Sequence, residues 1–440
     1  MPQERKDRKP MRWTRLDNAA KIFPPTSHGS DTGVFRLSCE LTEPVVPATL
    51  QQALDRTLAH YPHLRMVMRR GVFWYYLEQT TQRPLVEPER TPPCAPLYAG
   101  SRSLLLRVSY WRHKVNLEVY HVLADGAGAI AFFEALMTAY LVLCHPESGV
   151  DEQPQASVSQ RWADSFQKYY RPRAGGPSGE RMGRAWRLRG ARRPDGGLTV
   201  IEGVADVRQV LAAAHRYGAT LTVYLAAVLL EALHGEMYLR EQKRPVVLTV
   251  PVDLRSFFPS QTTRNFFGTI RVGYRFTGQE TSLEPIVRSV AAAFQTELTP
   301  ERLGARMNRL AALEHAPLLR PIPLALKNPV LRLAGDISER GETATLSNVG
   351  RFRLPEPLHP YVRGFGVFMS THALQLCTCS FGDSLHFGFT CALESTEVQR
   401  RFFQTLTQDA IEVEIRSNEY HEEVHRDAAL SELPRDRGRA

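Results

Sequence analysis

The alternation of apolar and polar residues over residues 103–123 predicts a β-hairpin. Two segments, "SLLLRVSYW" and "VNLEVYHVL", alternate as strands do and are joined by the short turn "RHK". In the second segment Val115, Leu117 and Val119 share one face, because successive side chains of a strand point to opposite faces. His121 continues this apolar row. We therefore expect its imidazole to point inward at the end of the strand.

Helical spacing follows this hairpin and recurs along the chain. "GAGAIAFFEALMTAYLVL" predicts a helix with Phe133, Leu136 and Tyr140 on its buried side, and "PATLQQALDRTLAHYPHLR" predicts a second that ends near its proline. The second half restarts with a strand and two helices divided at Gly218. "PVVLTVPVDL" has the continuous apolar run of a strand buried on both faces. Further strands are expected in "GVFWYYLEQ", "TIRVGYRF", "TATLSNVG", "LQLCTCSFG" and "SLHFGFTCAL", and helices in "LEPIVRSVAAAFQTEL" and "STEVQRRFFQTL".

The mixture of strands and helices in both halves indicates two α/β domains. A chain of 440 residues is too long for one ordinary core. Proline, glycine, serine and arginine replace the periodic pattern before it restarts, which marks a linker. We predict an N-terminal subdomain over 1–170, an arginine-rich linker over 171–195, a C-terminal subdomain over 196–420 and a charged tail over 421–440.

The charge of the chain is locally concentrated. The formal net charge is +9, and much of it lies in "MPQERKDRKPMRWTR" and "RPRAGGPSGERMGRAWRLRGARR". Neither stretch interleaves aromatic and basic residues as nucleic-acid modules do. We interpret them as a frayed terminus and a solvated linker and expect no nucleic-acid partner. An electrostatic aid to a phosphate-bearing substrate is the alternative.

The cysteines and the apolar segments bear on the compartment. No CxxC pair occurs, and no apolar core segment of a signal peptide opens the chain. The longest apolar candidate, "AIAFFEALMTAYLVLC", contains Glu134 and is shorter than the roughly 18 residues that a membrane span needs. We expect a cytoplasmic protein with no transmembrane segment and with six reduced thiols, Cys39, Cys94, Cys144, Cys377, Cys379 and Cys391.

The segment "HVLADG" holds the candidate chemistry. Asp125 follows His121 at the fourth position, so a turn can bring its carboxylate behind the imidazole or anchor the loop. Gly126 permits backbone conformations that other residues resist, and the helix that starts there directs amides toward developing negative charge. Taken alone, an inward histidine is more often a hydrogen-bonded core group than a base. A metal site would need a third ligand, since His113 lies on the turn, and no GxSxG nucleophile motif occurs.

An ordered set of motifs resembles the chloramphenicol acetyltransferase-like superfamily. "HVLADG" looks like its HxxxDG signature, and "HYPHLR" is similar to the HxxLR motif of condensation domains. "LDNAAKIFP", "PVDLRSFFPSQTTRNFFG" and "LSNVGRFRLP" resemble the stand-alone bacterial alcohol acetyltransferase-like branch. The resemblance spans about 12 to about 418 and implies two mixed-sheet α/β domains with the active-site channel between them. Tyr120 stands where condensation domains usually have another histidine, and no carrier or adenylation module is attached, so we expect a free-standing enzyme.

The resemblance also implies a reaction. His121 would act as general base when a hydroxyl or amine attacks an acyl thioester, and no covalent acyl-enzyme or cofactor would be needed. Asp125 would hold the loop through an arginine, for which the match is Arg65. The thioester would be acyl-CoA, with a carrier protein as the alternative donor. Two pairs complete the candidate site: Ser347 and Asn348 as substrate-binding or strand-edge residues, and Asp253 and Arg255 as structural residues. The alternative function is a catalytically silent relative that binds a ligand or partner.

Overall fold

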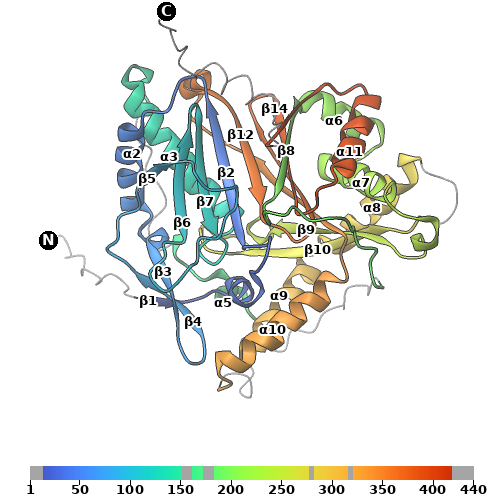
Figure 1. Ribbon diagram of the computed structural model, residues 1–440, viewed down its shortest axis with the longest axis horizontal. Coiled ribbons are helices and arrows are strands. Elements are labelled where there is room, and N and C mark those ends of the chain that lie inside the picture. The colour runs from blue at the N-terminus through green and yellow to red at the C-terminus, as the bar shows by residue number, and fades with distance from the viewer. Residues whose placement is uncertain (1–12, 151–160, 172–182, 277–281, 316–320, 419–440) are drawn as a thin grey trace, which may run out of the picture.

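The computed structural model describes residues 13–150, 161–171, 183–276, 282–315 and 321–418. Within these ranges two β-sheets lie side by side, one of five strands in the order β12-β2-β7-β6-β5 and one of seven in the order β10-β9-β11-β13-β14-β8-β15. Figure 1 shows helices covering the outer side of each sheet. The predicted architecture of two mixed α/β units is confirmed. The tail over 421–440 and the linker residues 172–182 lie outside the described ranges.

The predicted hairpin forms the centre of the five-stranded sheet. β6 (Leu106–Trp111) and β7 (Lys114–Tyr120) pair antiparallel, and β2 (Val34–Leu41) pairs antiparallel with the other side of β7. The turn between β6 and β7 puts Arg112 in the left-handed region at φ 49°. β5 and β12 form the edges of this sheet, and α2 and α3 pack together beside it. Their bounds are β5 Val86–Pro88, β12 Val362–Met369, α2 Pro47–His60 and α3 Gly126–Cys144.

The strand β12 links the two halves. It lies within the range predicted for the C-terminal subdomain, yet it pairs antiparallel with β2 of the first sheet. Glycines allow it to cross the second sheet closely. A Cβ on Gly388 of β14 would lie 2.2 Å from the carbonyl oxygen of Val367, and one on Gly364 would lie 2.4 Å from the His386 ring. The two subdomains therefore share strands as well as facing surfaces.

The seven-stranded sheet forms the second half. β9 (Val246–Asp253) lies between antiparallel β10 (Phe267–Tyr274) and parallel β11 (Ala344–Arg351), as its apolar run predicts for an interior strand. The helices α6, α7, α8 and α11 cover its outer face (Figure 1). The remaining bounds are β8 Thr199–Asp206, β13 Leu374–Phe381, β14 Ser384–Cys391, β15 Val413–Ser417, α6 Val207–Arg216, α7 Leu221–His234, α8 Leu283–Glu297 and α11 Glu397–Gln408.

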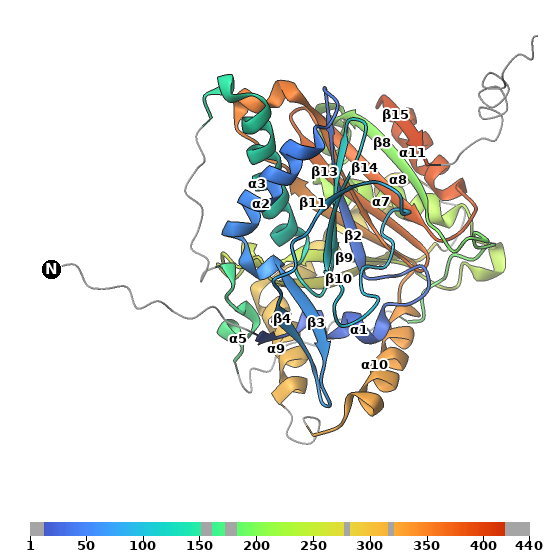
Figure 2. The ribbon, with the colours of Figure 1, turned by 60° about the vertical axis from the view of Figure 1, so that its left-hand side comes forward.

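A smaller set of elements closes the lower end of the molecule in Figures 1 and 2. β1 (Trp13–Arg15), β4 (Tyr75–Gln79) and β3 (Met66–Arg70) form a three-stranded sheet in the order β1-β4-β3. Two helices that the sequence patterns did not predict, α9 and α10, lie at the same end. Their bounds and those of two short helices are α9 Pro300–His315, α10 Leu324–Glu339, α1 Phe23–Thr26 and α5 Ser165–Tyr169.

Helix α3 is longer than the apolar segment expected from the sequence. Its 19 residues make it long and apolar enough to cross a membrane, and the bent pair α6–α7 would be a second such element if it counted as one span. Eight of its residues, including Phe132 and Phe133, are buried in the protein core. A core helix meets the same criterion, so this finding is weak support for a membrane span.

Candidate active site

A cavity of about 340 Å³ lies between the two sheets. Its walls come from β2 and β12 on one side and from β9, β10, β11 and β13 on the other. Buried apolar side chains line much of it, as is usual for small-molecule sites. Seven of the eight residues predicted for the site line this one cavity: His121, Asp125, Gly126, Asp253, Arg255, Ser347 and Asn348.

His121 sits directly after β7 and is held on several sides. Its backbone N–H donates to the carbonyl oxygen of Gly33 over 2.9 Å. The imidazole stacks on Phe23 with ring centroids 4.4 Å apart, and it also contacts Phe35 and Phe267. Only 8% of the residue is exposed. The inward orientation expected from strand alternation is confirmed, and three aromatic rings restrict the ring's rotation.

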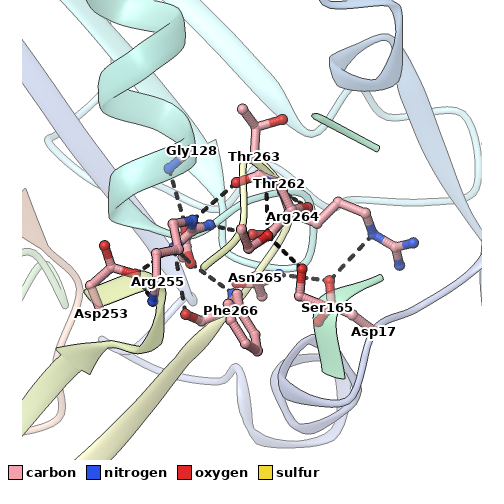
Figure 3. Close-up of polar contacts among 12 residues, drawn as sticks. Asp17, Gly128, Ser165, Asp253, Arg255, Thr262, Thr263, Arg264, Asn265 and Phe266 are labelled. Carbon is pink, nitrogen blue, oxygen red and sulfur yellow. Dashed lines mark hydrogen bonds and ion pairs between the residues drawn. The ribbon is translucent and has the colours of Figure 1, made fainter. Parts of the chain in front are cut away.

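A hydrogen-bond chain defines the tautomer of this histidine. Nδ1 of His121 lies 3.0 Å from Oδ1 of Asn265, and Nδ2 of Asn265 donates to Oδ2 of Asp17 over 3.2 Å. The Asn265–Asp17 part is visible in Figure 3. Because the amide nitrogen is committed to Asp17, its oxygen faces the ring and accepts a proton from Nδ1. Nε2 is then the nitrogen with the free lone pair.

The electrostatics of the cavity favour neutral imidazole. Burial lowers the pKa of His121, and the charge of Asp125 and the bond to Asn265 oppose this only in part. Burial also raises the pKa of Asp17 to about 6, against the nearby positive charge of Arg264. An imidazole with a lowered pKa is unprotonated near neutral pH and is able to accept a proton.

Asp125 caps helix α3 and forms a buried ion pair with Arg255. Its Oδ1 accepts from the backbone N–H of Gly128 over 2.9 Å. Nη1 and Nη2 of Arg255 donate to its two carboxylate oxygens over 2.9 and 3.1 Å. The backbone N–H of Phe266 adds a fourth bond over 2.8 Å. Each carboxylate oxygen of Asp125 therefore accepts two hydrogen bonds from the protein. The bidentate pair with Arg255 joins the first subdomain to the second.

Arg255 also organises the loop that follows β9. Its Nε donates to the carbonyl oxygen of Thr262 over 3.0 Å, and its Nη2 donates to that of Arg264 over 2.8 Å. Nη1 donates in addition to Oδ1 of Asp253 over 2.8 Å. Figure 3 shows the guanidinium at the centre of these bonds. Because Asn265 lies in this loop, the ion pair that fixes Asp125 also sets the position of the group that contacts His121.

The prediction that Arg65 partners Asp125 is wrong. Arg255 occupies that position, and within the part of the chain that the structure describes Nε of Arg65 has no hydrogen-bond partner. The neighbouring His63 points instead toward the loop, where its Nε2 meets Oγ1 of Thr263 over 2.5 Å. Sequence spacing alone cannot tell which of two arginines a turn brings to a carboxylate, and the "PVDLR" motif held the correct one.

The glycine prediction also needs correction. Gly126 is the first residue of α3, its φ is not left-handed, and an added Cβ would meet nothing closer than 3.9 Å. Gly128 is the position without room, since a Cβ there would lie 2.0 Å from the carbonyl oxygen of Thr263. The helix start therefore requires glycine where it touches the Arg255 loop, two residues beyond the expected place.

We predict that Gly128→Ala and Gly126→Ala differ sharply. Gly128→Ala must push the Thr263 backbone away and should lower the free energy of unfolding by about 3 kcal/mol. Gly126→Ala should change it by less than about 1 kcal/mol, because the site is open and alanine favours helix. Chemical denaturation of both variants measures the difference. Equal stability of the two would contradict the assigned close contact.

Ser347 and Asn348 differ in how their side chains are used. Nδ2 of Asn348 donates to Oγ1 of Thr222 over 2.9 Å, and its Oδ1 accepts from the N–H of Gly350 over 3.1 Å. Asn348 is thus committed to the fold although it lines the cavity. Ser347 lines the cavity as well. Of the two, we expect only Ser347 to be available to a bound molecule.

Other chemistry in the cavity is disfavoured by its surroundings. Cys377 lines the wall, but burial raises the pKa of its thiol to about 12, which disfavours the nucleophilic thiolate. Within the described ranges no group of three His, Cys, Asp or Glu residues is placed to hold a metal ion. Glu339, Glu342 and Arg187 also line the cavity. Burial raises the pKa of both carboxyls.

Comparison with known proteins gives structural relatives only. No family model matches the sequence, and no curated protein matches it. The first condensation domain of the CDA synthetase superposes with a TM-score of 0.59 at 17% identity, covering 91% of this chain and 96% of that one. Polyketide synthase associated protein 5 from Mycobacterium tuberculosis gives 0.58 at 14% identity, covering 89% and 96%. A mutant starter condensation domain of rhizomide synthetase RzmA, in complex with C8-CoA and Leu-SNAC, gives 0.58 at 14%, covering 90% and 94%. The chain therefore has the two-domain fold of condensation domains, which is of the chloramphenicol acetyltransferase-like type.

Proposed function

We propose that this protein is an acyltransferase that moves an acyl group from a thioester to a hydroxyl or amine, with His121 as general base. One observation carries the proposal: a buried, neutral imidazole lines a cavity between two subdomains, and Asn265 fixes the tautomer that leaves Nε2 free. A histidine that serves only the core would not need a cavity against its ring. The sequence resemblance to HxxxDG enzymes points to the same role.

The proposed acyl transfer proceeds without a covalent enzyme intermediate. Nε2 of His121 accepts the proton of the acceptor's O–H or N–H group as the oxygen or nitrogen attacks the thioester carbonyl. The new C–O or C–N bond produces a tetrahedral oxyanion. Its collapse breaks the C–S bond, and the imidazolium returns the proton to the leaving thiolate. Nδ1–H keeps its bond to Asn265, which stabilises the ring while it is charged.

The donor is proposed to be acyl-CoA. One structural neighbour was crystallised with C8-CoA and Leu-SNAC, and the alcohol acetyltransferase-like motifs point to a free-standing enzyme. A carrier-protein thioester is the alternative donor. The proposed chemistry uses no cofactor. Direct attack on a thioester requires a base, which is His121, and Asn265 positions that base.

Product analysis tests this proposal. Full-length protein is incubated with a mixture of acyl-CoAs and a panel of alcohols and amines, while free thiol and new esters or amides are followed by mass spectrometry. We expect thiol release that depends on acceptor, with one ester or amide per thiol. The protein could instead bind acyl-CoA but form no product with any acceptor, whether the donor is acyl-CoA or a carrier-protein thioester. That result would favour the silent ligand-binding alternative.

A further inference from the structure

The helix α10 exposes a stripe of large apolar side chains. Leu326, Val330, Leu333 and Ile337 are 64%, 66%, 57% and 56% exposed. Their spacing of four, three and four residues places them on one face of the helix. Leu324 is the buried residue of this helix. A surface helix normally turns such a stripe toward the core, and α10 does the opposite.

The tip of the β3–β4 hairpin, next to the start of α10, exposes three more large apolar side chains. Val72, Phe73 and Trp74 are 67%, 37% and 45% exposed. The tip is joined to the start of α10, because the N–H of Leu324 donates to the carbonyl oxygen of Val72 over 2.8 Å and Nζ of Lys327 donates to that of Phe73 over 3.2 Å. Figures 1 and 2 both place the tip and α10 at the same projecting end. We call these seven side chains the apolar end: Val72, Phe73, Trp74, Leu326, Val330, Leu333 and Ile337.

We propose that the apolar end docks on an anionic lipid bilayer. Clusters of exposed large apolar side chains mark interaction surfaces. These seven lie on a hairpin tip and a helix that both project from the molecule. An apolar stripe flanked by basic residues, with aromatic residues at its border, suits the interface between headgroups and acyl chains. Exposed Arg70, Arg332 and Arg340 lie on the same elements or directly after them, and they outnumber the half-exposed Asp336 of α10.

The N-terminal sequence adds charge complementarity. Residues 1–12 contain Arg5, Lys6, Arg8, Lys9 and Arg12 against Glu4 and Asp7. They lead directly into β1, which pairs with β4 of the same hairpin. Anionic membranes attract basic segments, at about 1 kcal/mol per basic residue near the surface. A water-soluble protein partner or a second copy of this chain would not by itself require this charge.

Helix α10 connects the hairpin tip, at Leu324, to the wall of the cavity. Helix α10 finishes at Glu339, and Glu339 lines the cavity that contains His121. If the proposed acyl transfer holds, and this part of the inference rests on it, the acceptor class is amphipathic lipids with a hydroxyl or amine group. The docking itself does not depend on the activity.

Vesicle flotation tests the docking. The full chain is mixed with phosphatidylcholine vesicles, with or without about one-third phosphatidylglycerol, at low and high salt. We expect flotation with the anionic vesicles that weakens as salt rises. Val330→Asp combined with Leu333→Asp should reduce binding by roughly ten-fold or more. The matched control is Tyr238→Asp with Leu239→Asp, which adds the same two charges where the side chains are 69% and 84% exposed elsewhere on the surface, and it should bind as wild type does.

The outcomes separate this inference from the proposed activity. Acyl transfer to a short, water-soluble acceptor should be the same in both double variants, with unchanged circular dichroism. Absence of flotation, or flotation that the α10 variant does not reduce, would overturn the inference even if the enzyme is active. A wild-type dimer in sedimentation that the α10 variant dissociates, without vesicle binding, would assign the surface to a second copy instead.

Discussion

Replacing His121 with alanine is expected to lower turnover by about 10²- to 10⁴-fold, the usual contribution of a general base. The imidazole is buried among aromatic rings and lines the cavity. Its loss therefore removes the proton acceptor from the cavity. Thioester binding should stay within a few-fold of wild type, because the ring acts on the acceptor's proton. Single-turnover transfer and acyl-CoA titration measure the two quantities separately.

Intact-mass analysis completes the experiment. Incubation of wild type with donor alone should leave the protein mass unchanged, since direct attack forms no acyl-enzyme. The isosteric control His121→Gln retains a polar group of similar size but no base, so it should lose as much turnover as alanine. Undiminished transfer in either variant, or a stable acyl adduct on wild type, would reject the mechanism.

The pH dependence of the same assay follows from the lowered pKa of His121. Burial is its main cause, so the rate should rise with pH below the ordinary histidine range and be level through neutrality. Asn265 raises the pKa through its bond to Nδ1, so Asn265→Leu should move the rising limb to still lower pH while reducing the maximal rate. A purely structural asparagine would change stability without moving this limb.

Local patterns were sufficient for the hairpin, for β9 and α3, and for the direction of His121. The hairpin and α3 have periodic patterns and β9 has a continuous apolar run, each within one segment, and the parity of three valine and leucine positions placed the imidazole inward. The partner of Asp125 could not be found in this way. Arg65 and Arg255 both follow a buried segment in the sequence, and only the tertiary fold decides which guanidinium reaches the carboxylate.

The residues linked to His121 through hydrogen bonds could not be found from local patterns either. Asp17 and Asn265 belong to "LDNAAKIFP" and "TTRNFFG", two stretches noted in the sequence only for their resemblance. They are separated by 248 positions and meet at a hydrogen bond that no spacing rule predicts. Helix α10 escaped prediction for a different reason: Pro329 lies within it, and an internal proline normally indicates the end of a helix.

The ion pair between Asp125 and Arg255 should produce the largest effect on stability. Arg255→Met is expected to lower the free energy of unfolding by about 3–5 kcal/mol, the usual cost of leaving one partner of a buried pair uncompensated. The two side chains are only 4% and 14% exposed, so water cannot replace the lost bonds easily. The loop carbonyls of Thr262 and Arg264 lose their donor as well.

Activity should fall together with stability in this variant, because the loosened loop contains Asn265. Transfer measured well below the unfolding midpoint should therefore be reduced, and Arg255→Lys should be intermediate, since an ammonium keeps the charge but not the bidentate fork. Asp125→Asn combined with Arg255→Met removes the unpaired charge and should recover part of the lost stability, but not the position of Asn265.

A matched surface pair shows whether burial is the cause. Arg208 also bonds both carboxylate oxygens of an aspartate, Asp206, but its side chain is 70% exposed. Arg208→Met should leave the denaturation midpoint almost unchanged, because exposed ion pairs contribute little. If Arg255→Met unfolded at the same denaturant concentration as Arg208→Met, the pair would not join the subdomains as described. A stable Arg255→Met variant with full transfer would also show that the loop reaches His121 without it.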